Sequence, residues 1–138
     1  MEVLFKGIYT LYAGASAEAI ALRSGLSGGL HFYNAPQDTN YPYGVYFMVS
    51  NVPERMFQER FENSIVQFSI FSSREHSTDA ADEVVGNRDL LVALFDECAL
   101  TITGYTHLYM LRFFDELLAV EDDVFQYSIR YRILAEKN

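Results

Sequence analysis

The sequence has a single cysteine, Cys98, and no tryptophan among its 138 residues. One cysteine excludes an intrachain disulfide and a cysteine-based zinc site, which is typical of proteins kept in a reducing compartment. No run approaches the roughly 18 apolar residues that span a bilayer, so no membrane segment is predicted. The charged segment after Met1 lacks the apolar core of a signal peptide. We therefore expect a protein made and kept in the cytosol, or in a particle assembled there.

Basic residues are also few. Ten Lys and Arg stand against 19 Asp and Glu, which gives a formal net charge of −9. The basic residues are dispersed along the chain and form no basic tail. Because phosphate backbones repel an acidic chain, the charge disfavours sequence-independent binding of nucleic acid.

Apolar and aromatic residues are abundant. Half of the residues are hydrophobic, and there are 11 Phe and 10 Tyr. A chain of this size can bury a core without disulfides, and we expect one domain over residues 1–138. Phe and Tyr favour pleated, half-buried surfaces, so substantial β-structure is predicted.

Hydrophobic spacing divides the chain into helices and strands. The predicted elements, in order, are helices at 2–12 and Ala17–Arg23, a short strand compatible with Leu30–Tyr33, a loop at Asn34–Tyr43, strands at Gly44–Ser50 and Ser64–Ser73, a helix at 78–97, and strands at Thr106–Leu118 and Val124–Ala135. Asn51–Asn63 is compatible with either a long hairpin arm or a brief helical turn. Glu121–Asp123 is predicted to be a turn.

Three details of these elements are specific enough to test. Ser77 or Thr78 is expected to cap the longest helix. Its predicted core-facing stripe consists of Ala81, Val84, Val85, Leu91, Leu94 and Phe95. Alternation places Val66, Phe68 and Ile70 on one face of their strand, and Phe125, Tyr127, Ile129, Tyr131 and Ile133 on one face of the last strand.

The predicted fold is α+β. The element order is a helical N-terminus, two strands, a long helix and two more strands. This order fits one twisted, mainly antiparallel four-stranded sheet, with the helices on one face. Each strand pair can form an antiparallel hairpin. The edge strands are long and rich in aromatics, and free edges of that kind can pair with another chain.

No catalytic or metal-binding constellation is predicted. The histidines His31, His76 and His107 match no metal-ligating spacing, and the glycines at 25, 28 and 29 form no phosphate-binding motif. Cys98 follows the C-terminal turn of the predicted helix, where the dipole raises a thiol pKa, so we interpret it as structural. The acidic residues Glu121–Asp123, with Asp115 and Glu116 nearby in the sequence, lack the EF-hand pattern and are interpreted as a solvated hairpin tip. We therefore expect no enzyme activity, cofactor or metal.

Several stretches carry a family resemblance. They are LHFYNAPQDTNYPYGVYFMVSN (Leu30–Asn51), the polar arm after it, IVQFSIFSS, and the helix DAADEVVGNRDLLVALFDE. Their order resembles the tail-completion, or tail-terminator, family of long-tailed bacteriophages and related prophages. The order of elements matches over essentially the whole chain, whereas the local motif is short: Pro36, Gln37, Tyr41, Pro42 and Tyr43. The terminal strands carry more aromatics than the family pattern, which leaves the branch of the family open.

The resemblance implies a structural subunit of a virion neck or tail, assembled in the bacterial host cytoplasm. It implies a homo-oligomeric ring, generally of six copies, that caps the tail-tube protein and joins it to the head connector or head-closure protein. DNA would pass through the ring without specific binding. The candidate interface residues are Asp38, Tyr41 and Tyr43 in the Pro-containing loop, and Arg55, Met56, Phe57, Arg60 and Phe61 in the arm.

Two alternatives stay open at this point. One is a small-ligand-binding or hydrolytic α+β domain, with a deep pocket that includes His31 or His107. The other is a different component of the same neck, such as a head-closure protein. For Phe57 and Phe61, local packing within the arm is an equal alternative to an interface role.

Overall fold

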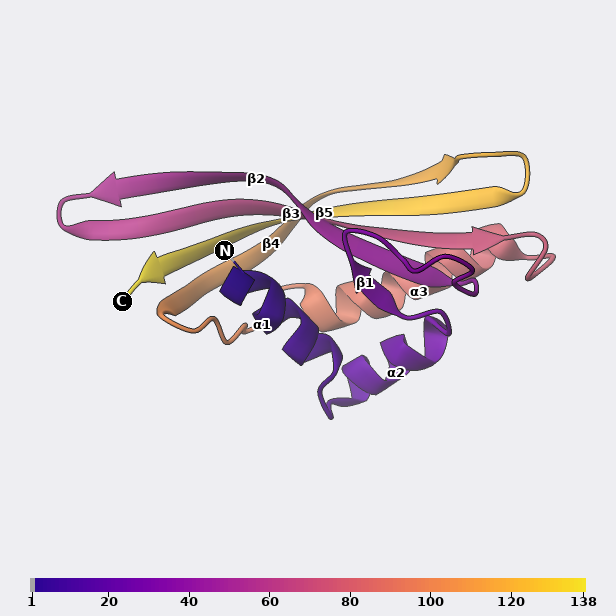
Figure 1. Ribbon diagram of the computed structural model, residues 1–138, viewed down its shortest axis with the longest axis horizontal. Helices are drawn as coiled ribbons and strands as arrows, with labels where there is room; N and C mark the ends of the chain where they lie inside the picture. The colour runs from indigo at the N-terminus through magenta and orange to yellow at the C-terminus, as the bar shows by residue number, and fades with distance from the viewer. Residues whose placement is uncertain (1) are drawn as a thin grey trace.

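A computed structural model describes residues 2–138. The helices are α1 (Glu2–Tyr12), α2 (Ala17–Gly25) and α3 (Ala80–Phe95), and the strands are β1 (Leu30–Phe32), β2 (Tyr43–Met56), β3 (Glu59–Ser73), β4 (Tyr105–Ala119) and β5 (Val124–Lys137). The strands form one sheet in the order β1-β2-β3-β5-β4, and the helices lie on one side of it (Figure 1). The predicted α+β class is confirmed. No helix within residues 2–138 is long and apolar enough to cross a membrane.

The predicted sheet lacked one strand. The sheet has five strands and is mixed, because β1 pairs in parallel with β2 through Leu30↔Gly44 and Phe32↔Tyr46. The sequence is compatible with a short strand at this place, but the predicted four-stranded sheet did not include it. The loop between the two strands is closed by hydrogen bonds that Gly28 N donates to Pro42 O (2.9 Å) and Gly44 N donates to Gly29 O (2.9 Å). These bonds hold the start of β2 against β1.

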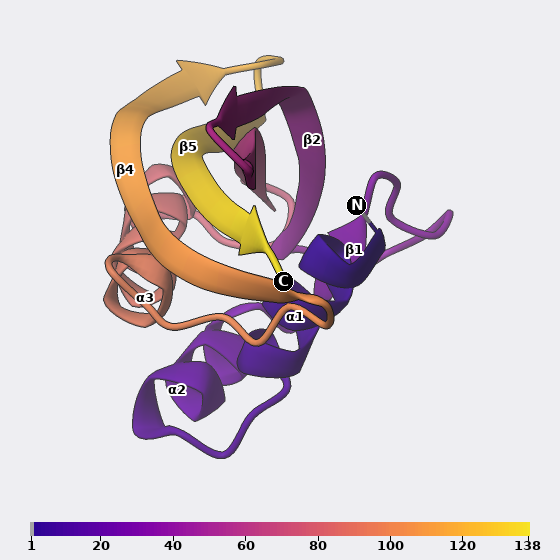
Figure 2. The same cartoon turned by 90° about the vertical axis from the view of Figure 1, so that its left-hand side faces the viewer.

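Two long antiparallel hairpins make up most of the sheet. β2 pairs with β3, β4 pairs with β5, and β3 and β5 join the two hairpins at the centre. Figure 2, which looks along the sheet, shows that β2 and β4 bow around β5, so the sheet is curved. The β2–β3 pairing continues in register to Met56↔Glu59. The region 51–63 is therefore a hairpin arm, and the helical-turn alternative was wrong.

The core lies between the sheet and the three helices. Val66, Phe68 and Ile70 of β3 are buried on the helix-facing side, as the alternation predicted. On β5, Ile129, Tyr131 and Ile133 are buried on this side, while Phe125 and Tyr127 are half-buried and pack against the same core, so the predicted shared face is confirmed. Phe68 packs on Phe95 of α3, with ring centroids 4.7 Å apart. The helices contribute Leu4, Ile8, Tyr12, Ala19, Leu22, Val84, Leu91 and Leu94.

The predicted start and buried face of α3 were partly wrong. The residue before its first turn is Asp79, whose side chain makes no capping hydrogen bond; Ser77 Oγ instead accepts a bond from Asp79 N at 3.2 Å. Val84, Leu91, Leu94 and Phe95 are buried as predicted, but Val85 is exposed and Ala81 only half-buried. Asn87 is buried in their place, because α2 approaches so closely that a Cβ on Gly25 would lie 2.3 Å from Asn87 Oδ1. The contact between α2 and α3 therefore determines which face of α3 is buried. The hydrophobic periodicity of the sequence does not contain this information.

Candidate assembly surfaces

The arm, defined here as residues 52–63, is the exposed end of the β2–β3 hairpin. It extends beyond the helices at one end of the molecule (Figure 1). Phe57 occupies the turn with a φ of 58° and is fully exposed, and Met56 beside it is also exposed. Phe61 lies opposite Glu54 and is half-buried. Local packing therefore does not account for Phe57, whereas Phe61 is partly covered within the arm.

Arg55 and Arg60 face each other across the arm as a register pair. Like charges directly opposite in a sheet are destabilising. Within residues 2–138 neither guanidinium takes part in an ion pair. The pair is therefore a cationic feature of one face of the arm. The arm as a whole is not basic, because Glu54, Glu59 and Glu62 accompany the two arginines.

The Pro-containing loop and the start of β2 form a groove, here called the loop groove. Its lining includes Tyr33, Asp38, Tyr41, Tyr43, Val45 and Phe71, around a volume of about 630 Å³. Tyr43 stacks on Phe71 with ring centroids 5.1 Å apart, and Tyr41 lies 5.4 Å from Tyr43. Partial burial raises the pKa of Tyr43, and the neighbouring Tyr41 adds to the rise. The structure thus places Asp38, Tyr41 and Tyr43, the candidate interface residues of the loop, along one groove.

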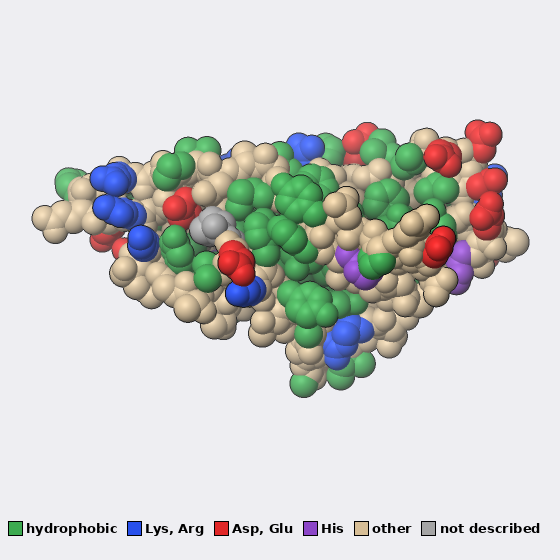
Figure 3. Space-filling view, viewed as in Figure 1, with side chains coloured by type: hydrophobic (Ala, Val, Ile, Leu, Met, Phe, Trp, Pro, Cys, Tyr) green, Lys and Arg blue, Asp and Glu red, His purple; other side chains and the backbone are tan. Residues whose placement is uncertain are grey.

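The acidic tip, Glu121–Asp123, lies next to the loop groove. Tyr41 borders both the groove and a depression formed with Ser73, Glu75 and the acidic tip. Arg74 N donates a hydrogen bond to Asp123 O at 2.8 Å, which fixes the tip against the end of β3. Figure 3 shows Asp and Glu side chains along this end of the molecule, and both basic and acidic side chains at the end that carries the arm. The two predicted interface clusters therefore lie at opposite ends of the sheet.

Asp115 does not belong to the acidic tip. Its carboxylate accepts hydrogen bonds from Arg88 Nη2 (2.9 Å), from Tyr127 Oη (2.8 Å) and from Arg112, on the side of the sheet that faces α3. Partial burial alone raises the pKa of Asp115, but these donors outweigh it and lower the pKa to about 2. These hydrogen bonds link α3 to β4. Asp115 therefore stabilises the fold and is not part of the exposed acidic tip.

The histidines and the cysteine do not converge. His31 Nε2 lies 2.7 Å from Gly28 O, His76 lies 3.6 Å from Glu83, and His107 Nδ1 accepts from Leu100 N at 3.1 Å. Burial lowers the pKa of His107. Within the part of the chain that is described, no group of three His, Cys, Asp or Glu is placed to hold a metal ion.

Cys98 is half-buried against Met110. Burial raises the pKa of its thiol to about 12, and the charge of Asp96 adds to the rise. The predicted direction agrees, but the main cause is burial and not the helix dipole.

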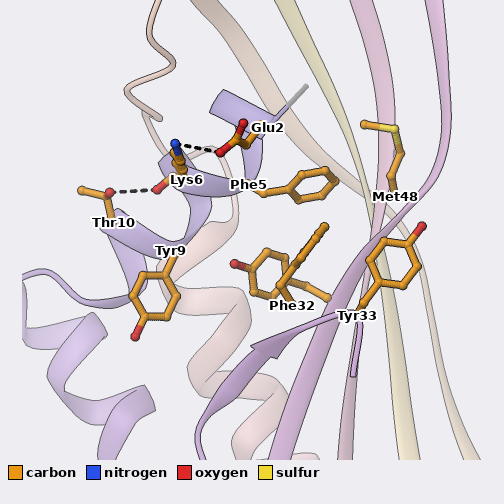
Figure 4. Close-up of a pocket in the computed structure, with 9 residues that line it drawn as sticks. Glu2, Phe5, Lys6, Tyr9, Thr10, Phe32, Tyr33 and Met48 are labelled. Atoms are coloured by element: carbon orange, nitrogen blue, oxygen red, sulfur yellow. Dashed lines mark hydrogen bonds and ion pairs between the residues drawn. The ribbon is translucent and has the colours of Figure 1, made fainter. Parts of the chain in front are cut away.

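A second groove, here called the helix groove, was missed by the sequence interpretation. It lies between α1 and the β1–β2 edge, has a volume of about 810 Å³, and is lined by aromatics and a methionine, among them Phe5, Tyr9, Phe32, Tyr33 and Met48 (Figure 4). Lys6 and Glu2 pair with each other at 2.8 Å, and Thr10 Oγ1 donates to Lys6 O at 2.8 Å. Its charged groups therefore satisfy each other, and neither His31 nor His107 lines it. The only sequence signal was the aromatic density of three separate segments.

Comparison with known proteins identifies the fold. The chain is similar to a chain of the virion of a native gene transfer agent (GTA) particle, with a TM-score of 0.64 and 9% sequence identity, over 95% of this chain and 92% of that chain. No protein-family model matches, and no curated protein matches. At this identity the likeness is one of fold, over nearly the whole chain.

Proposed function

We propose that this protein is a structural subunit of a phage-like virion, and that it acts in the neck as a tail-terminator-type protein. The observation that carries the proposal is the fold similarity, over nearly the whole chain, to a chain of a gene transfer agent virion. The order of elements in the sequence supports the same assignment independently, because that order resembles the tail-terminator family over essentially the whole chain.

The proposed role is to cap the tail tube and to join it to the head connector as a ring, with six copies as the family would have it. Residues 1–138 would act as one domain. The exposed arm and the loop groove support this role, because both present aromatic and charged groups that the described chain itself leaves uncovered. The proposed interface residues are Asp38, Tyr41, Tyr43, Arg55, Met56, Phe57, Arg60 and Phe61.

The acidity of the chain supports passage of DNA rather than binding. Each copy carries a net charge of −9, so a ring would be strongly acidic and would not retain a phosphate backbone. The helix groove does not favour a catalytic alternative, since its charged side chains are paired and its remaining lining is mostly aromatic.

The test is the growth of tail tubes. Purified protein is added to tail-tube protein from the same particle while it polymerises, and the tubes are examined by negative-stain electron microscopy. We expect density at one end of each tube and arrested elongation. Binding along the tube wall, or tubes of unchanged length, would contradict the proposal. Binding to the head connector without any effect on tubes would indicate a head-closure protein instead.

A further inference from the structure

We propose that the arm of one copy docks in the loop groove of a second copy, so that copies associate head to tail. This inference deepens the proposed function and rests on it for the expectation that copies meet in a ring. The two halves of the contact are the two clusters at opposite ends of the sheet: Arg55, Phe57 and Arg60 on one copy, and the loop groove with the acidic tip on the next.

The arm cannot fill the groove of its own chain. β2 begins in the groove at Tyr43 and continues as one strand to Met56 at the arm, with a register shift between Met48 and Ser50. A strand rises about 3.3 Å per residue, so these 14 residues hold the two sites about 40 Å apart. The strand is paired with β3 on both sides of this shift and cannot fold back. Only another molecule can bring an arm to this groove.

The apolar groups of the two sites match. Phe57 stands fully exposed at the turn, and Met56 adjoins it. The lining of the loop groove includes the aromatic side chains of Tyr33, Tyr41, Tyr43 and Phe71, together with Val45. Aromatic pairs contribute beyond the area that they bury, and methionine sulfur also makes favourable contacts with aromatic rings. An exposed aromatic side chain at the arm thus fits a groove lined by aromatic side chains.

The charges of the two sites also match, and this selects the loop groove over the helix groove. One face of the arm presents the opposed Arg55 and Arg60. Glu62 on this face accepts a hydrogen bond from Asn51 Nδ2, and Glu54 and Glu59 lie on the other face. The loop groove is flanked by Asp38 and, beyond Tyr41, by the acidic tip. Within residues 2–138 none of these acidic groups takes part in an ion pair. In the helix groove, Glu2 is already paired with Lys6. Docking in the loop groove would therefore relieve the repulsion between the two arginines.

A contact between unlike surfaces has a consequence for assembly. After the first contact the pair of copies still has one free arm and one free groove, so association continues until a ring closes or a filament grows. A symmetric dimer cannot satisfy both sites through this contact unless it exchanges both arms. The proposed contact would therefore produce a closed ring or an open filament of copies.

An engineered disulfide tests the contact directly. Gln58→Cys at the arm and Asn34→Cys at the groove leave Phe57, Tyr41 and all the charges in place. The matched control is Gln58→Cys with Ala93→Cys, an exposed position on α3. Native Cys98 is half-buried with a raised pKa, which limits background coupling. We expect a ladder of linked oligomers on a non-reducing gel for Gln58→Cys/Asn34→Cys and monomers for the control, with and without tail tubes present.

Charge reversal then tests the pairing. Arg55→Glu/Arg60→Glu and Asp38→Arg/Asp122→Arg, each placed in the Gln58→Cys/Asn34→Cys background, should reduce the linked fraction by at least about tenfold. An equal mixture of the two reversed proteins should restore it, because each arm then finds a groove of opposite charge. All four positions are exposed, so thermal unfolding should be nearly unchanged.

The outcomes separate this inference from the proposed function. Tube capping without a ladder, or a ladder that charge reversal leaves unchanged, would overturn the inference and leave the capping role standing. A ladder that responds to charge in a protein that never caps tubes would support the inference and refute the capping role.

Discussion

Replacing Asp115 by Asn tests how firmly α3 is held to β4. The carboxylate accepts hydrogen bonds from Arg88 on α3, from Arg112 on its own strand and from Tyr127 on β5. These donors lower its pKa from 3.8 to about 2. One pKa unit corresponds to about 1.4 kcal/mol, and since the side chain retains 22% exposure we expect a loss of roughly 2 kcal/mol in the free energy of unfolding at pH 7.

The lowered pKa of Asp115 determines how its contribution to stability changes with pH. Because the pKa is lower in the folded state, the stabilisation is fully present above the unfolded pKa of about 4 and disappears as the pH falls through about 2. The difference between wild type and Asp115→Asn should therefore shrink to about half by pH 3. Urea unfolding followed by tyrosine fluorescence at pH 7, 5 and 3 measures it.

Glu116→Gln provides the control for Asp115→Asn. It removes the same charge from the next residue, which is exposed and takes no part in an ion pair within residues 2–138. It should change stability by less than about 0.5 kcal/mol. If the two variants lose equal stability at pH 7, or if the Asp115→Asn difference stays constant down to pH 3, the reasoning from specific hydrogen bonds is refuted.

Three further predictions follow from packing and burial. Phe68→Ala should lower the free energy of unfolding by about 3–5 kcal/mol, whereas Phe57→Asp at the exposed arm should change it by less than about 0.5 kcal/mol; equal losses in urea unfolding would contradict the burial difference. Gly28→Ala should destabilise the protein, because the new Cβ would lie 1.8 Å from Asn40 O, while Gly86→Ala, with nothing within 4 Å, should raise the melting temperature through about 0.5–1 kcal/mol of helix propensity. Cys98, with a thiol pKa of about 12, should react with iodoacetamide at pH 8 far more slowly than free cysteine in the same mass-spectrometric assay; a comparable rate would show that the thiol is not buried as described.

Local periodicity was sufficient for most of the fold. The alternation in β3 and β5 identified which side chains enter the core, because a strand exposes opposite faces at successive residues. A short strand at Leu30–Tyr33 was compatible with the sequence, and β1 lies there, but three residues are too short to show a period, so its place in the sheet was not predicted. Hydrophobic periodicity misjudged α3, where the close approach of Gly25 to Asn87 decided the buried face.

The candidate surfaces were predictable only in part. Tyr41 and Tyr43 are near neighbours in the sequence, so their grouping with Asp38 required no long-range information. The proximity of the acidic tip to this loop could not be predicted, because the two are about 80 residues apart and meet only through the register of β3 with β5. The helix groove likewise depends on three segments that are separate in the sequence, so local patterns could not predict it.

The sheet edges bear on how copies meet. β4 is an edge strand over its whole length, and an unpaired edge of that kind would ordinarily attract another strand. Here its register with β5 is interrupted between His107 and Tyr109 and again between Arg112 and Phe114, and such bulges disrupt the ladder at the edge. β2, beyond its short pairing with β1, has an interruption between Met48 and Ser50.

These irregularities oppose the edge-to-edge pairing that the aromatic content of the strands suggested. They do not affect the arm, where β2 and β3 pair without interruption from Ser50 to Met56. This continuous pairing places Phe57 at the turn, where it is fully exposed. For the proposed assembly, this favours contacts at the end of the arm rather than along the open edges, and the length of the β2–β3 hairpin would then set the spacing of neighbouring copies.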